Sequence, residues 1–436
     1  MRQGTRWTGV LTLALAMVVV GTLLPGRAER TDSPLAGTGA AVDSLLAPTA
    51  GSDVPAVVAR LQERVREDRN DVRSLALLGL AYLKRAGQTQ DPVYLTKAGQ
   101  VIDRALALQP DGNYEAFVGA GNLALARHDF RRALMWGRRG AGLRPDAPEP
   151  LGITGDALIE LGHYSAAAGA IQSMVDRRPA LPSYARVSYF REMHGDLDGA
   201  VAAMRAAYSA AGTAVDAAWV DVHLGELYIK QNRIDLATRH LRRAHATVPK
   251  DPAASFGLAH VAMIEGRRRE AIRIMRNVVL RYPSPVYAAF LGELFVAAGD
   301  RRSAGYQFDL VRAQIELAEA NGGIADVETY LFLLDHGSVT DDLVAELVAL
   351  YTSRPSVRVA DVYAWALFKS GRLHRAGRVI RAAVKLGTPD PLIEFHAARI
   401  YSALGHYDRA RAEMRKAVSH GLAAWPLQMK EARSRI

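Results

Sequence analysis

The amino-acid sequence predicts an all-α fold of stacked helical hairpins, and three recurring features support this prediction. Small or aliphatic residues recur at a period of about 34 residues, a spacing that indicates a repeat protein; they are Ala98, Ala133, Ala167, Ala200, Ala237, Ala271, Ala304, Leu343, Ala376 and Ala410. Prolines recur in step with them, at Pro110, Pro145, Pro179, Pro249, Pro283 and Pro355. A glycine-led turn also recurs, at Gly162-His163-Tyr164, Gly195-Asp196-Leu197, Gly371-Arg372-Leu373 and Gly405-His406-Tyr407.

The stretch from Ala218 to Pro249 shows why each unit should be a hairpin of two helices. Its apolar stripe, at helical spacing, consists of Leu224, Tyr228, Leu241 and Ala244. Gly225 and Ala237 are small where two antiparallel helices must approach closely. Pro249 ends the second helix, because proline lacks an amide donor and clashes with the preceding turn. One hairpin cannot bury its own apolar face, so the copies must stack.

This arrangement resembles the tetratricopeptide repeat (TPR) family, in the form found in exported bacterial proteins. The resemblance covers residues 72–424 and implies a right-handed α-α superhelical solenoid of about ten TPR helix hairpins with end-capping helices. It also implies a non-catalytic scaffold that binds a protein or peptide. In this family the partner usually lies in a concave groove lined by the first helix of each repeat.

Residues 1–28 are predicted to be a secretory signal peptide that is cleaved after Ala28. Arg2 and Arg6 precede an apolar run from Val10 to Leu24, and a small-residue site follows. The alternative is an uncleaved N-terminal membrane anchor, since the run is near the length that spans a bilayer. Both interpretations place the repeats outside the cytoplasm, and both leave membrane contact through this segment open.

Three further segments flank the repeats. Residues 29–53 are rich in Ser, Thr, Pro, Gly and Ala and are expected to form a flexible linker. Residues 54–71 carry an amphipathic pattern and are expected to form a capping helix, since the open end of a repeat stack needs a cover. Residues 425–436 depart from the repeat pattern and are expected to form a cap or tail at the other end.

Composition and motifs argue against catalysis. The chain contains no cysteine, which excludes disulfides, thiol catalysis and thiolate metal sites. It also lacks a His-Glu-x-x-His motif, a phosphate loop, a Gly-x-Ser-x-Gly motif and a calcium loop. The histidines occur singly and are interpreted as packing or solvated side chains. We therefore expect no enzyme activity, no cofactor and no metal site.

The family resemblance selects a candidate partner-binding groove in the C-terminal half of the repeats. Its residues are Trp219, His223, Glu226, Phe256, His260, Phe290, Glu293, Phe332, Asp361, Trp365, Phe395 and Arg399. Exposed aromatic side chains flanked by charge are typical of peptide binding. The alternative is that several of these aromatic rings pack against the next repeat instead.

The formal net charge of +10 is expected to lie elsewhere, on the convex face formed by the second helices. The convex basic residues are Arg131, Arg132, Arg138, Arg139, Arg242, Arg243, Arg268, Arg269, Arg273, Arg276, Arg375, Arg378, Arg381 and Lys385. They suggest an alternative function, binding to an anionic membrane or envelope polymer. The interpretation we prefer is a solvated face that maintains solubility. Nucleic acid is not an expected partner, because export removes the opportunity and no aromatics alternate with the arginines. The sequence leaves the partner's identity and the oligomeric state open.

Overall fold

The computed structural model describes residues 54–89, 91, 93–320 and 325–434, and the expected signal segment and linker lie outside these ranges. All regular structure in the described residues is helical. The helices are α2 (Val54–Glu67), α3 (Val72–Thr89), α4 (Val93–Leu108), α5 (Tyr114–Ala126), α6 (Phe130–Leu143), α7 (Glu149–Glu160), α8 (Tyr164–Arg177), α9 (Leu181–Met193), α10 (Leu197–Ser209), α11 (Ala214–Lys230), α12 (Ile234–Thr247), α13 (Pro252–Ile264), α14 (Arg268–Arg281), α15 (Pro285–Ala297), α16 (Arg301–Ala320), α17 (Val327–His336), α18 (Asp341–Ser353), α19 (Val357–Lys369), α20 (Leu373–Ala383), α21 (Pro391–Ala403), α22 (Tyr407–Ser419), the 3-10 helix η1 (Leu422–Ala424) and α23 (Pro426–Arg433). Within the described ranges, no helix combines the length and the apolar composition needed to cross a bilayer.

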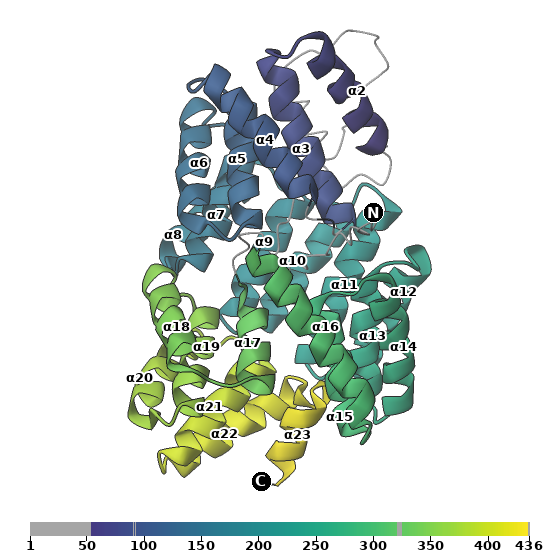
Figure 1. The fold of residues 1–436 in the computed structure, drawn as a ribbon, viewed down its shortest axis with the longest axis vertical. Coiled ribbons are helices and arrows are strands. Elements are labelled where there is room, and N and C mark those ends of the chain that lie inside the picture. The colour runs from purple at the N-terminus through teal and green to yellow at the C-terminus, as the bar shows by residue number, and fades with distance from the viewer. Residues whose placement is uncertain (1–53, 90, 92, 321–324, 435–436) are drawn as a thin grey trace, which may run out of the picture.

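Helices α3 to α22 alternate as the first and second helices of successive hairpins, so the predicted all-α solenoid is confirmed (Figure 1). The number of repeats and the hand of the superhelix stay predictions. Helix α2 packs against α3 at the N-terminal end of the stack. The pair α17 and α18 lacks the close packing of the other pairs. At this pair the sequence has Leu343 where every other aligned position has alanine.

Small residues set the distance between helices, as the repeat pattern predicted. The aligned alanines are all buried. Leu241 on α12 fills a notch between two glycines, Gly225 on α11 and Gly257 on α13. A Cβ atom on either glycine would lie 2.6 Å from a side-chain carbon of Leu241. One leucine therefore locks its own hairpin to the next, and neither glycine can be replaced without moving it.

The turn between the two helices of a hairpin repeatedly needs a residue with positive φ. Glycine supplies it in most hairpins, and these turn glycines are Gly162, Gly195, Gly266, Gly299, Gly371 and Gly405. Two hairpins use other residues at this place, His128 with φ 57° and Asn232 with φ 55°. The turn geometry is thus more regular than the glycine pattern in the sequence.

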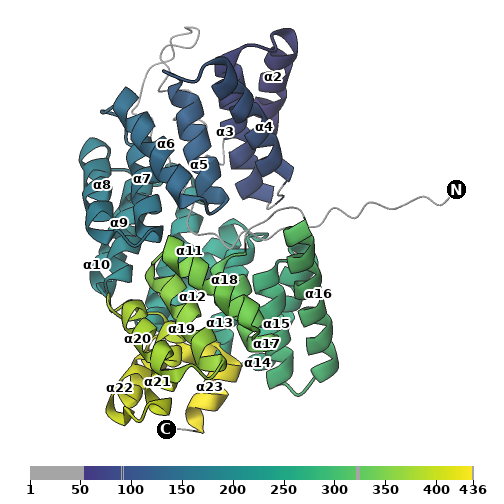
Figure 2. The ribbon, with the colours of Figure 1, turned by 60° about the vertical axis from the view of Figure 1, so that its left-hand side comes forward.

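The superhelix is curved so tightly that repeats far apart in the sequence are in contact. In Figure 1 α8 lies directly above α18, and in Figure 2 α10 lies directly above α20. The Arg354 side chain, just after α18, donates hydrogen bonds to Glu160 at the end of α7, with 3.0 Å between Nε and Oε2. These two residues are 194 positions apart, and their side chains are only 9% and 8% exposed.

Two further hydrogen bonds support this contact. The Val357 N–H donates to the Tyr164 hydroxyl at 2.9 Å, and the Thr388 hydroxyl donates to the Met193 carbonyl at 2.6 Å. The repeats of most solenoids contact only their neighbours. Here the stack closes on itself, and we call the contacts between residues 160–195 and 354–388 the closure contact.

Replacing Arg354 with alanine should lower the free energy of unfolding by about 3 kcal/mol, because Glu160 would keep a buried charge without its partner. Urea denaturation followed by circular dichroism measures this change. The matched control is Arg131→Ala on the exposed surface of α6, which should change stability by less than about 0.5 kcal/mol. Equal effects of the two substitutions would contradict a buried closure pair.

Candidate binding groove

The inner face of the superhelix carries a series of polar contacts between successive first helices. Each joins side chains about one repeat apart, and we call the set the inner ladder. Its pairs are Asp156–Arg186, Glu192–Lys230, Glu293–His336, Glu328–Arg358, Asp335–Trp365 and Asp361–His396. Arg186 is the best-defined example, since its Nε and Nη2 atoms donate to the two oxygens of Asp156 at 2.9 and 2.7 Å.

Sequence reasoning missed several members of this ladder, among them Glu192, Lys230 and Arg358. Opposite charges one repeat apart on first helices were the signal that could have found them. Lys230 lies between Glu192, Glu226 and Asp390, and these carboxylates raise its pKa although burial lowers it. The inner face is therefore mainly a surface of paired charges, where the family resemblance implied exposed aromatic side chains flanked by charge.

Three of the expected groove residues form an accessible cluster on α11. The rings of Trp219 and His223 are in contact in a tilted arrangement, with 4.1 Å between their centroids. His223 Nδ1 lies 3.1 Å from Glu226 Oε2, and the Glu226 side chain is 47% exposed. Burial raises the pKa of Glu226, but the hydrogen bond and charge of His223 outweigh this and lower it. The cluster thus presents an ionised carboxylate beside a half-buried indole ring.

Six of the expected groove residues are buried instead: Phe290, Glu293, Phe332, Asp361, Trp365 and Phe395. For these residues the expectation of an exposed groove is wrong, and the alternative of packing against the next repeat holds. The Trp365 ring is stacked between Phe368 and His396, with centroids at 5.0 and 4.2 Å. Its indole N–H donates to Asp335 at 2.8 Å. The large Trp365 ring, although it lies on a first helix, is thus buried by packing between repeats.

Two histidines of the inner face, His396 and His336, are held by carboxylates from the neighbouring first helix. His396 Nδ1 lies 3.0 Å from both oxygens of Asp361, and His336 Nε2 lies 3.1 Å from Glu293. Burial lowers the pKa of His396, but the Asp361 carboxylate outweighs this effect and raises it. In the described part of the chain, no group of three or more His, Asp or Glu side chains could hold a metal ion.

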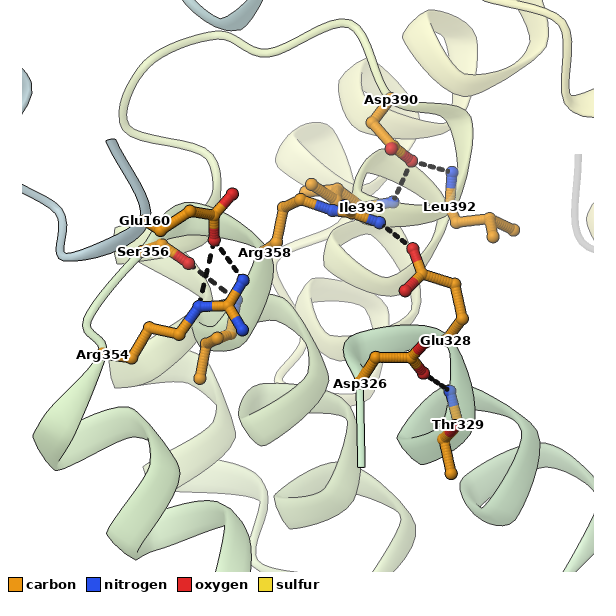
Figure 3. A network of polar contacts seen from close by, with 11 residues as sticks. Glu160, Asp326, Glu328, Thr329, Arg354, Ser356, Arg358, Asp390, Leu392 and Ile393 are labelled. Carbon is orange, nitrogen blue, oxygen red and sulfur yellow. Dashed lines mark hydrogen bonds and ion pairs between the residues drawn. The ribbon is translucent and has the colours of Figure 1, made fainter. Parts of the chain in front are cut away.

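A polar network lies where the closure contact meets the inner face. Figure 3 shows Arg358 between the Glu160–Arg354 pair and Glu328, with Asp326 and Asp390 nearby. Arg358 and Glu328 remain 33% and 28% exposed. Burial raises the pKa of Asp326 to about 6, and the charge of Glu328 adds to this effect. Charges from both halves of the chain therefore meet in one accessible part of the groove.

The last three expected groove residues are Phe256, His260 and Arg399. His260 and Arg399 contact the C-terminal segment, which we define as residues 421–434, and Phe256 packs against His260 and Phe290. Trp425 lies against His260 and Phe290, with ring centroids 5.2 and 5.6 Å apart. Arg399 on α21 forms an ion pair with Glu431 on α23. The expected C-terminal cap thus also reaches across to α13 and α15.

The basic residues expected on the convex face lie on second helices, with one exception. Lys385 follows the end of α20 and lies over the Tyr164 ring beside the closure contact, so its expected place on a second helix is wrong. All of the convex basic residues named above are exposed except Arg139, which is half-buried. Arg269 and Arg273 on α14 form no ion pair with any described residue. Leu280 on the same helix is 84% exposed.

His260 should make stability depend on pH. Burial lowers its pKa to about 4 from an ordinary 6.5, so between these values the unfolded chain binds a proton that the folded chain does not. Stability therefore falls as the pH decreases through this window. The difference between wild type and His260→Phe should change by up to about 1.4 kcal/mol per pH unit in urea denaturation. Other groups, such as Asp326, titrate in both proteins, so their contributions cancel in the difference between wild type and variant. Parallel stability curves would contradict a His260 with a lowered pKa in the folded chain.

Comparison with known proteins agrees with this fold. Two family models described as tetratricopeptide repeat match residues 228–294 and 395–419. No curated protein matches the chain.

Several solved structures are similar. A thermophilic TPR protein of Thermus thermophilus matches with 20% identity and a TM-score of 0.36, over 40% of this chain and 94% of that one. The human IFIT1 dimer with PPP-AAAA matches with 13% identity and a TM-score of 0.44, over 85% and 95%. The MamA protein matches with 17% identity and a TM-score of 0.31, over 38% and 91%. The two family matches and the helical hairpins show that this chain contains tetratricopeptide repeats.

Proposed function

We propose that this chain is a non-catalytic scaffold that holds a protein or peptide partner in its inner groove, in the bacterial cell envelope. Tetratricopeptide repeats generally form scaffolds for protein interaction. The observation that carries the proposal is the accessible cluster of Trp219, His223 and Glu226 on the inner face of α11.

The surroundings of this cluster favour a partner with a basic or apolar side chain. Glu226 is ionised and accessible, and the nearby inner ladder adds the charges of Glu192 and Lys230. Binding energy at protein interfaces is concentrated in a few aromatic and charged residues, with tryptophan among the most frequent. Trp219 is the only tryptophan of the expected groove that stays half-buried, since Trp365 is enclosed by its neighbours.

The location outside the cytoplasm rests on the sequence of residues 1–28. Positive charge precedes an apolar run there, and a small-residue site follows, as in secretory signal peptides. The absence of cysteine is compatible with an oxidising compartment, because nothing in the chain can form an unwanted disulfide.

Trp219→Ala should weaken retention of the partner by about tenfold or more, the range of tryptophan hot spots. The purified protein serves as bait in an envelope extract, and retained proteins are quantified after a high-salt wash. Trp136→Ala, at a half-buried tryptophan on the outer helix α6, is the matched control and should retain the partner fully. If Trp219→Ala retained the same protein as strongly as wild type, the groove assignment would be wrong.

A second candidate function is binding to an anionic surface through the convex face. Arg269, Arg273, Arg276 and Leu280 follow one another at helical spacing on α14, so they form one exposed stripe. Neighbouring Arg267 is neutralised by Glu265 and Glu270, but the stripe itself contains no acidic residue. Basic residues near an anionic membrane are attracted to its headgroups, and the exposed Leu280 is placed to enter the interface.

Arg269→Glu with Arg273→Glu should abolish binding to vesicles of anionic phospholipid, because it reverses the charge of the stripe. Binding of wild type should fall as salt rises, since screening shortens the range of attraction. Leu280→Ser should weaken binding to vesicles but not to a soluble polyanion, and co-sedimentation measures both. Equal binding of wild type to neutral and anionic vesicles would exclude this function.

A further inference from the structure

We infer that the inner pocket of Phe256, His260 and Phe290 recognises a partner segment bearing a tryptophan and a following short helix with a carboxylate. The C-terminal segment occupies this pocket as an internal competitor. The inference rests on the proposed function and names the chemistry of its partner and the element that regulates access.

The pocket is formed by rings from two successive first helices. Phe256 and His260 lie on α13 with centroids 4.2 Å apart, and Phe290 on α15 lies 5.2 Å from Phe256 and 4.9 Å from His260. The Trp425 ring joins this cluster through contacts with His260 and Phe290. His260 Nε2 has no hydrogen-bond partner among the described residues, so the pocket retains an unused polar atom beside the indole.

A second anchor fixes the orientation of the bound segment. Pro426 begins α23 directly after Trp425, and proline is favoured at the first position of a helix. Glu431 then meets Arg399, whose guanidinium also lies over the rings of Phe368 and Phe395 at 5.5 and 6.0 Å. The bound chain therefore shows three recognisable features in order: an aromatic ring, a short helix and a carboxylate.

The path of the chain shows that the C-terminal segment does not simply continue the stack of repeats. Gly421 has φ 101°, and a Cβ atom there would lie 2.9 Å from Ile229 on α11. After this turn the segment leaves α22 and crosses to the two earlier repeats, where α23 lies beside α15 (Figure 1). Expected groove residues from three repeats thus contact one segment, as they would contact a peptide.

Leu422 and Ala432 anchor the C-terminal segment in the core, but two features favour displacement of the segment. Its helix α23 has only 8 residues, and Trp425 stays partly exposed. Chain ends open locally with a lower free energy than the core. An attached ligand nevertheless has an effective concentration on the order of millimolar, so a free partner must bind more tightly than the segment alone or arrive with further contacts.

The test uses a fluorescent peptide with the sequence of residues 421–434 and the full chain carrying Trp425→Ala and Glu431→Gln, which vacates the pocket. Fluorescence anisotropy should show that this variant binds the peptide. Wild type should bind it at least about tenfold more weakly, because its own segment competes for the pocket. The matched control peptide has alanine in place of its tryptophan and should not bind. Phe256→Ala added to the opened variant should abolish binding, whereas Tyr306→Ala, at an exposed ring on α16, should not.

A second route covers the case in which the double variant fails to fold. Arg399→Glu weakens the anchor and leaves Trp425 intact, so it should also raise peptide binding. Combining it with Glu431→Arg restores opposite charges and should bring binding back toward the wild-type value. No binding of the peptide to a folded opened variant, or equal binding of the tryptophan and alanine peptides, would overturn the inference.

Failure here is separable from failure of the proposed function. If the bait retains a protein through Trp219 while no variant binds the peptide, then only the inference that the C-terminal segment competes for the pocket is wrong. If the peptide binds the opened variant but an envelope extract yields no retained protein, the pocket stands and the proposed scaffold function falls.

Discussion

The close approach of helices at small residues is the constraint on which the rest of this structure depends. Leu241 fits between Gly225 and Gly257, so one side chain fixes both the hairpin and its junction with the next one. Ile102 occupies a similar place between Gly79 and Gly119. Repeated along the stack, such junctions rotate each repeat relative to its neighbour, and the accumulated rotation curves a solenoid. In this chain the curvature is tight enough for the third and fourth hairpins to meet the eighth and ninth.

Packing between successive repeats limits what the inner face can do. An open groove would leave its aromatic residues available to a partner, but here Trp365 and Phe395 are buried within the C-terminal repeats. The remaining inner surface is dominated by paired charges such as Glu328–Arg358. Ion pairs with partly desolvated members contribute little net stability unless their geometry is good, yet breaking one is costly. The inner ladder therefore fixes the relative positions of the first helices, and it adds little to the net stability of the fold.

Much of the fold could be predicted from the sequence because each repeat encodes its contacts with its neighbours. The aligned alanines, the turn glycines and Leu241 all act within one or two hairpins, and the period reveals them. The closure contact could not be predicted in this way, since Glu160 and Arg354 lie 194 residues apart and neither departs from ordinary repeat composition. Nor does the period say whether a ring such as Phe290 faces solvent, because that depends on a C-terminal segment outside the repeats.

The candidate site could likewise be predicted only in part, because contacts within a repeat are encoded locally and long-range contacts are not. Trp219, His223 and Glu226 were expected on the inner face of α11, and the structure brings them together there. Phe256, His260 and Arg399 were expected to meet a partner. His260 and Arg399 instead meet the C-terminal segment of their own chain, and Phe256 packs against His260. Whether either surface binds another protein depends on accessibility, which is a property of the closed superhelix and not of any single repeat.

Closure of the superhelix is the central claim, and a distance between its two sides tests it most directly. The chain has no cysteine, so His163→Cys and Ser353→Cys place spin labels at two chosen exposed positions beside the Glu160–Arg354 pair. Pulsed electron paramagnetic resonance on this double variant measures the distance between the labels. A closed superhelix gives one short and narrow distance distribution in solution. A long, broad distribution would show that the stack is open and that the closure contact does not form.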